Sequence, residues 1–251
     1  LKLFGFTFYF LILLVIFLSY KAASYRLNIL FGKRVLILQI FTLLFYSFFL
    51  TLMVYVAIRQ GMAIIVVLYF CIKTVNEEIG SKKFYKELLF IVFSSLLHLS
   101  TLIIVPFIFF KKIFKRYIRL FNLLFYLVFI AYSTGLYYEF AFFDNSILGD
   151  FSNIFRSLSV TEEHTMYEVG PTLKKSLSII LPILIVEITK KYYTNYQRIK
   201  LEPIILFYKY ISIVTMLLSN LPYNDRILIF GWAFIPIMLS LPLNLLIKYI
   251  F

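Results

Sequence analysis

Long apolar stretches are the feature that most constrains what this chain can fold into. Hydrophobic residues fill 62% of its 251 positions, and charged residues fill only 15%. A water-soluble domain of this size could not bury so much apolar surface, because burial is limited by surface-to-volume scaling. The sequence therefore predicts an all-α, polytopic integral membrane helical bundle. It argues against a soluble enzyme, a nucleic-acid-binding domain and a disordered chain.

Six stretches are long and apolar enough for us to expect helices that span a membrane, which needs about 20 apolar residues. They are Leu3–Tyr20, Val35–Val56, Ile118–Tyr138, Thr172–Thr189, Glu202–Ser219 and Ile227–Ile247. Two further regions are ambiguous. Gly61–Lys73 is short, and Phe84–Ile113 is either one long helix or a hairpin that folds back at His98. We expect residues 1–251 to form a single transmembrane domain with about 8–9 membrane segments.

The charged residues decide between one long helix and a hairpin. Lys and Arg outnumber Asp and Glu by 25 to 12, and basic residues accumulate in the cytoplasmic loops of membrane proteins. The bases gather in four loops, which are Lys21–Arg34, Lys73–Glu87, Lys111–Arg119 and Lys190–Lys200. All four loops share one side only if the chain turns back at His98. We therefore expect a hairpin there, and an external acidic loop at 139–176.

Three residues are candidates for chemistry on the external side. Arg59 interrupts an apolar stretch, where an arginine is costly enough to indicate a functional site, although it could instead snorkel from a short turn. His98 could act as a general base near neutral pH, or it could be a structural histidine bonded to a carbonyl. Arg226 starts the last predicted helix, where a bound anion or the neighbouring Asp225 would offset the helix dipole.

Two other charge patterns lie further along the chain. His164 and Glu168 would share a face of a helix, but no second histidine lies nearby. A solvated acidic loop is therefore a better interpretation than a metal site. We expect neither a metal nor a cofactor. Glu187 and Lys209 are the other charges inside predicted helices, and they could pair between neighbouring helices.

Three short motifs occur in an order that resembles one protein family. Ile58–Ala63 contains an Arg-Gln-x-x-Ala step, Phe93–Leu102 contains an apolar-His-x-Ser pattern, and Asn224–Arg226 supplies a late arginine. This arrangement resembles the EpsG/Wzy-like polymerases of bacterial exopolysaccharide, capsule and O-antigen assembly. The resemblance covers roughly Val56 to the C-terminus. The acidic Asp-Tyr motif of the family's additional N-terminal helices has no counterpart before Val35, so we expect an N-terminally truncated member.

The resemblance implies an activity and a set of site residues. Arg59, His98 and Arg226 would be the catalytic residues. The residues that would bind the substrate are Gln60, Ser100, Arg156, Tyr223 and Asp225. The implied activity is that of a metal-independent glycosyltransferase, which joins polyprenyl-pyrophosphate-linked oligosaccharide units at the external face of the bacterial plasma membrane.

The implied partners are the lipid-linked oligosaccharide, the lipid bilayer, a chain-length regulator and a flippase, and no nucleic acid is expected. The main alternative is that the chain is itself a lipid-linked oligosaccharide flippase or another membrane transporter. Transporters usually contain pseudo-symmetric halves and broken helices, and neither is evident in the sequence. A third interpretation is an acyl- or ligase-type membrane transferase that acts on the same external side.

Overall fold

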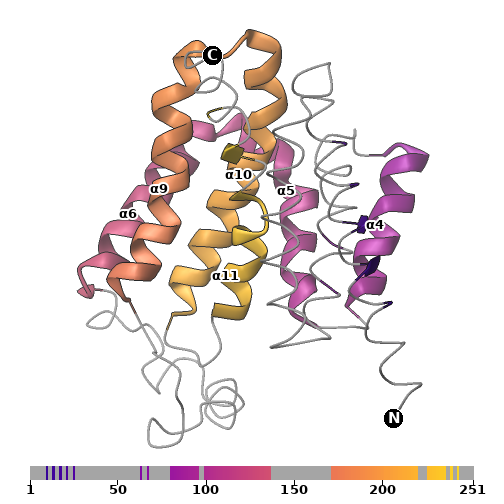
Figure 1. The fold of residues 1–251 in the computed structure, drawn as a ribbon, viewed down its shortest axis with the longest axis horizontal. Coiled ribbons are helices and arrows are strands. Elements are labelled where there is room, and N and C mark those ends of the chain that lie inside the picture. The colour runs from indigo at the N-terminus through magenta and orange to yellow at the C-terminus, as the bar shows by residue number, and fades with distance from the viewer. Residues whose placement is uncertain are drawn as a thin grey trace, which may run out of the picture.

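The computed structural model describes residues 80–95, 99–136, 171–219 and 225–235, together with isolated positions elsewhere. These residues are almost entirely helical, so the all-α prediction is confirmed for this part of the chain (Figure 1). In chain order the elements are α4 (Lys82–Ser94), the short 3₁₀ helix η1 (Leu99–Ile103), α5 (Ile104–Arg116), α6 (Ile118–Ser133), α9 (Leu173–Thr189), the short 3₁₀ helix η3 (Lys190–Tyr192), α10 (Asn195–Leu217) and α11 (Asp225–Trp232).

The expected bundle of about 8–9 membrane-spanning segments is wrong. None of the described helices combines the length and the apolar character that crossing a membrane requires. A bilayer core takes about 20 apolar residues, whereas α6 has 16 residues and α9 has 17. The 23-residue α10 is longer, but Arg198, Lys200 and Glu202 lie in its first turns and Lys209 lies further along it.

The expected helices coincide with the observed ones in position more closely than in extent. The expected spans Ile118–Tyr138, Thr172–Thr189, Glu202–Ser219 and Ile227–Ile247 fall on α6, α9, α10 and α11. The last of these begins at Asp225 and has eight residues. The stretches Leu3–Tyr20, Val35–Val56 and Gly61–Lys73 and most of the expected loop at 139–176 lie outside the continuously described residues.

Capping residues set where three of the helices begin. At the start of α4, the Phe84 N–H donates a hydrogen bond to the Ser81 Oγ at 3.0 Å. Thr172 caps α9 in the same way at 3.2 Å. A capping box starts α10, because the side chains of Thr194 and Gln197 each accept from the other residue's backbone N–H. Such caps supply acceptors to N–H groups that have no partner within the helix.

The chain doubles back between α4 and α5. Phe84, near the start of α4, contacts Phe109 edge to face with ring centroids 6.3 Å apart, and the Lys111 Nζ lies 5.4 Å from the centre of the Phe84 ring. Because the start of α4 contacts residues near the middle of α5, past its first turn, the two helices are antiparallel. The reversal falls between Ser94, where α4 ends, and Ile104, where α5 begins. Pro106 favours it, since a proline breaks the interior of a long helix but is tolerated in the first turn of α5.

Contacts along α10 show that it runs antiparallel to α5. The Lys115 Nζ near the end of α5 lies 3.5 Å from the Glu202 Oε2 near the start of α10. Further along α10, the Tyr210 hydroxyl donates to the Ile103 carbonyl, just before α5, at 2.9 Å. The start of α5 therefore lies toward the end of α10.

The remaining helices pack in the same up-and-down manner. In the turn that follows α11, Phe234 contacts Phe207 of α10 with ring centroids 4.7 Å apart, while Gly231 lies against Ile211. The start of α11 thus lies near the end of α10. The Ser133 hydroxyl at the end of α6 donates to the Ser176 Oγ near the start of α9 at 3.3 Å.

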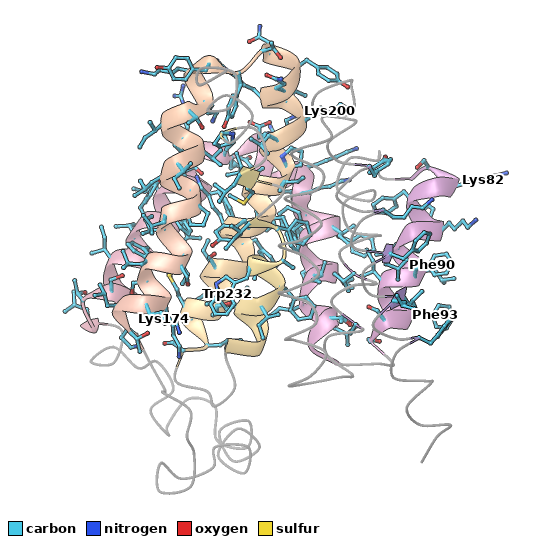
Figure 2. The ribbon with its side chains drawn as sticks, viewed as in Figure 1. Lys82, Phe90, Phe93, Lys174, Lys200 and Trp232 are labelled. Atoms are coloured by element: carbon cyan, nitrogen blue, oxygen red, sulfur yellow. The ribbon has the colours of Figure 1, made fainter. Side chains whose placement is uncertain are left out.

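The ends of the described helices therefore gather into two groups, one on each side of the helical bundle. The basic end comprises the start of α4, the end of α5, the start of α6, the end of α9, η3 and the start of α10. The opposite end comprises η1, the start of α5, the end of α6, the start of α9, the end of α10 and the start of α11. Figure 2 shows Lys82 and Lys200 toward the basic end, and Phe93 and Lys174 toward the opposite end.

The core lies around α10, while much of the outer surface is apolar. Twelve residues of α10 are buried. On α6, exposed side chains recur at a helical spacing and form a stripe, which consists of Leu120, Leu123, Leu124, Leu127 and Ile130. A similar stripe on α9 consists of Leu173, Leu177, Leu181, Leu184, Ile185 and Ile188. Contiguous exposed apolar surface of this kind marks a contact with lipid or another protein.

Candidate functional site

Most of the residues expected to carry chemistry lie outside the described part of the chain. These are Arg59, Gln60, His98, Arg156 and Tyr223. The backbone is described for Ser100 in η1 and for Asp225 and Arg226 at the start of α11. These three positions belong to the opposite end of the helices, where the chain reverses between α4 and α5. The distances between the expected catalytic side chains are therefore not among the described geometry.

The described polar cluster lies instead around Lys209, in the middle of α10. Its side chain is only 2% exposed, and its Nζ donates a hydrogen bond to the Asn122 Oδ1 of α6 at 2.9 Å. The same Nζ lies 3.6 Å from the Glu187 Oε1 of α9, which confirms the expected pairing of these two residues. The rings of Phe125 and Tyr126 lie 5.7 and 5.6 Å from the ammonium, at cation–π distance.

The electrostatics of this cluster reflect its burial. Removal from water lowers the pKa of Lys209, and Lys190 lowers it further, whereas Glu187 opposes the shift. Glu187 is about one-third exposed and also lies 3.5 Å from the Lys190 Nζ. Burial, with a smaller contribution from the Glu187 charge, raises the pKa of Tyr126. One carboxylate thus holds two ammonium groups, one of them buried and the other half exposed.

A cavity of about 210 Å³ adjoins the cluster at the basic end. Its polar lining comes from α6, the end of α9, η3 and the first turns of α10, and consists of Asn122, Glu187, Lys190, Tyr193, Arg198, Glu202 and Lys209. The Tyr193 hydroxyl shares a short hydrogen bond with the Thr189 Oγ1. Burial raises the pKa of Tyr193 to about 12, although that hydrogen bond acts in the opposite direction.

The charged side chains that line the cavity differ in whether they have ion-pair or hydrogen-bond partners. Glu187 is held by Lys190 and Lys209, and Glu202 is held by Lys115. The Arg198 Nη2 donates to the Lys191 carbonyl at 3.1 Å. The Arg198 Nε, however, is buried and has no hydrogen-bond partner among the described residues. A buried donor without an acceptor is rare in folded proteins, so this cavity is chemically suited to an anion.

Sequence reasoning missed Arg198 and Asn122, because it treated residues 190–200 as a loop and Asn122 as part of an apolar span. One signal could have found the arrangement. The Thr194 and Gln197 spacing is a capping box, which marks the start of a helix. With the helix beginning there, Arg198, Glu202 and Lys209 share one face, because their spacings are four and seven residues.

The cavity provides hydrogen-bond donors and positive charge rather than ligands for a metal. Among residues 80–95, 99–136, 171–219 and 225–235, no three His, Cys, Asp or Glu side chains lie together as a metal would require. No protein-family model, no curated protein and no solved structure matches the chain.

Proposed function

We propose that the chain acts as a polysaccharide polymerase at the external face of the bacterial plasma membrane. It joins oligosaccharide units that are carried on polyprenyl pyrophosphate. The observation that supports this best is the chain reversal between α4 and α5. The apolar-His-x-Ser motif lies between these two helices in the sequence, and the start of α11, with its late arginine, lies at the same end as the start of α5.

The proposed reaction needs charge stabilisation more than it needs covalent chemistry. A hydroxyl oxygen of the acceptor sugar forms a bond to the anomeric carbon of the donor, and the bond from that carbon to the pyrophosphate oxygen breaks. His98 takes the proton from the attacking hydroxyl. Arg59 and Arg226 bind the departing pyrophosphate through charge-assisted hydrogen bonds, which are stronger in a site shielded from water.

The proposed membrane location is supported by the outer faces of the helices. The apolar stripes on α6 and α9 are exposed in the isolated chain, and large apolar side chains such as Phe93 and Phe110 are exposed on α4 and α5. A lipid-linked substrate must meet an enzyme at the membrane surface or within it. These faces would contact acyl chains there, as large exposed apolar patches commonly do.

The most direct test replaces Arg59 with lysine, which keeps the charge but loses the planar pair of donors. We expect the polymer-length distribution to collapse to single units while the protein still reaches the membrane fraction. Arg116→Lys is the matched control, because Arg116 stacks on Tyr117 at the basic end, away from the motif residues. Polymer of normal length from Arg59→Lys would remove Arg59 from the site and contradict the proposal.

A second experiment separates the polymerase from the alternative transporter. The purified chain is given lipid-linked repeat units in detergent, where no compartments exist. New glycosidic bonds in detergent support the polymerase. Movement of the substrate across vesicle membranes without new bonds would support a transporter instead and contradict the proposal.

A further inference from the structure

We propose that the cavity at the basic end is a binding site for a phosphate group, held by the guanidinium of Arg198 with Lys190 beside it. This inference goes beyond the proposed function, because the cavity and the motif residues with described backbone lie at different ends of the helices. It rests on the charges that line the cavity, on the burial of one donor and on the exposed side chains of η3 and the start of α10.

The charges that line the cavity favour an anion over a cation. Three cations and two carboxylates face it, but both carboxylates already have ammonium partners. Glu187 is shared by Lys190 and Lys209, and the Glu202 Oε2 lies 3.5 Å from the Lys115 Nζ. A metal ion or an ammonium ligand would have to displace these lysines. An anion meets a guanidinium that no described carboxylate neutralises.

The position of Arg198 explains why it would be the principal ligand. It lies in the first turn of α10, where the capping box already satisfies the helix start. One terminal nitrogen is engaged by the Lys191 carbonyl, whereas the buried Nε has no partner among the described residues. A guanidinium presents its donors in a plane that matches two oxygens of a phosphate. Lys190 uses Glu187 for one donor and retains others for the same anion.

The side chains of η3 and the start of α10 suggest where the phosphate could come from. Exposed tyrosines stand beside basic residues in this part of the chain, with the Lys191 Nζ 5.0 Å from the Tyr192 ring and the Lys200 Nζ 5.9 Å from the Tyr196 ring. Tyrosine and basic side chains together are typical of a membrane–water interface. The phosphate is therefore either part of an anionic lipid headgroup or free in solution, and both would meet the same donors.

The test measures the thermal unfolding midpoint of the full chain purified in detergent. Inorganic phosphate is titrated against chloride at equal ionic strength, and a short-chain phosphatidylglycerol is titrated against phosphatidylcholine with the same acyl chains. A ligand that binds only the folded state raises the midpoint as its concentration rises. Because Arg198 would make charge-assisted hydrogen bonds, we expect Arg198→Gln to raise the half-effect concentration by about tenfold or more.

Two further variants keep the test decisive. Arg198→Lys keeps the charge, so its half-effect concentration for phosphate is expected to lie between those of the unmodified chain and Arg198→Gln. This variant also tests the proposal if Arg198→Gln fails to fold. Arg116→Gln removes an exposed arginine at the same end and should leave the half-effect concentration unchanged. Stabilisation by inorganic phosphate identifies a soluble ligand, and stabilisation by phosphatidylglycerol alone identifies a lipid headgroup.

Two results would overturn the proposal. One is that chloride and phosphatidylcholine raise the unfolding midpoint as much as phosphate and phosphatidylglycerol do. The other is that Arg116→Gln loses as much stabilisation as Arg198→Gln, because the effect would then come from the general positive charge of the surface.

Discussion

The two ends of the described helices differ in how their chemistry is encoded. At the opposite end, the candidates with described backbone, such as Arg226 at the start of α11, come from short motifs in which a few neighbouring residues carry the signal. At the basic end, the cluster is assembled from Asn122, Glu187 and Lys209, which lie on three different helices. Motifs reveal chemistry that is local in the chain, whereas a buried charge becomes interpretable only when the fold supplies its partners.

The largest difference between the ends should be in activity. If the opposite end carries the reaction, His98→Ala should lower polymer yield by at least about 100-fold through loss of the general base. Arg198→Gln at the basic end should change it by less than about twofold, as expected of a residue that does not act in proton transfer. Polymer yield per unit of protein in the membrane fraction is the measurement. A loss at Arg198 as large as the loss at His98 would remove the division between the ends.

The next largest effect should be the loss of the buried ion pair at the basic end. Glu187→Ala leaves the Lys209 ammonium buried without its carboxylate, so the free energy of unfolding should fall by about 3 kcal/mol. Lys209→Met fills the same space with an apolar chain and leaves Glu187 with Lys190, so its cost should stay below about 1 kcal/mol.

Denaturant unfolding in detergent would measure both variants. Glu202→Ala is the control, because it breaks the more exposed pair with Lys115 and should cost less than about 1 kcal/mol. If Lys209→Met proved more damaging than Glu187→Ala, the burial of an uncompensated ammonium would not be the main cause of the lost stability.

A smaller effect should follow from loosening the join between α10 and the start of α5. Tyr210→Phe removes the hydrogen bond to the Ile103 carbonyl, which should lower the free energy of unfolding by about 1 kcal/mol. Tyr85→Phe is the matched control on α4, where the side chain is exposed and the change should be close to zero. Equal effects at the two positions would show that this bond does not hold the start of α5 against α10.

The smallest effect should be the pH dependence that Lys209 contributes. Burial lowers its pKa below the ordinary value of 10.5. Between these two values the unfolded chain binds more protons, so the free energy of unfolding should rise with pH over the part of that interval that lies below about pH 10. Lys209→Met should flatten that rise. Above about pH 10 the slope of the free energy of unfolding against pH changes sign. The pKa values of Tyr193 and Tyr210 are raised in the folded chain, so the unfolded chain loses those protons first.

The helical class and the positions of α6, α9 and α10 could be predicted from the sequence, because apolar stretches of this length favour helices in any apolar environment. The lengths of the helices could not be predicted from hydropathy. Hydropathy does not show where a capping residue such as Thr194 begins a helix, nor where a glycine such as Gly135, at φ 75°, follows the end of a helix. The pairing of Glu187 with Lys209 was accessible because charges inside apolar stretches need partners. The roles of Asn122 and Arg198 could not be predicted, because they depend on which helices pack together.

The central claim is that α4 and α5 double back, so that the basic turns lie at one end while η1 and the start of α11 lie at the other. Spin labels at Tyr85 and Phe110, two exposed positions, in a Cys71→Ser background of the full chain would test it through their distance. Packed helix axes lie about 8–10 Å apart, so the account predicts a distance within about 20 Å once the label linkers are included. A single straight helix would place the labels about 38 Å apart, and that result would contradict it.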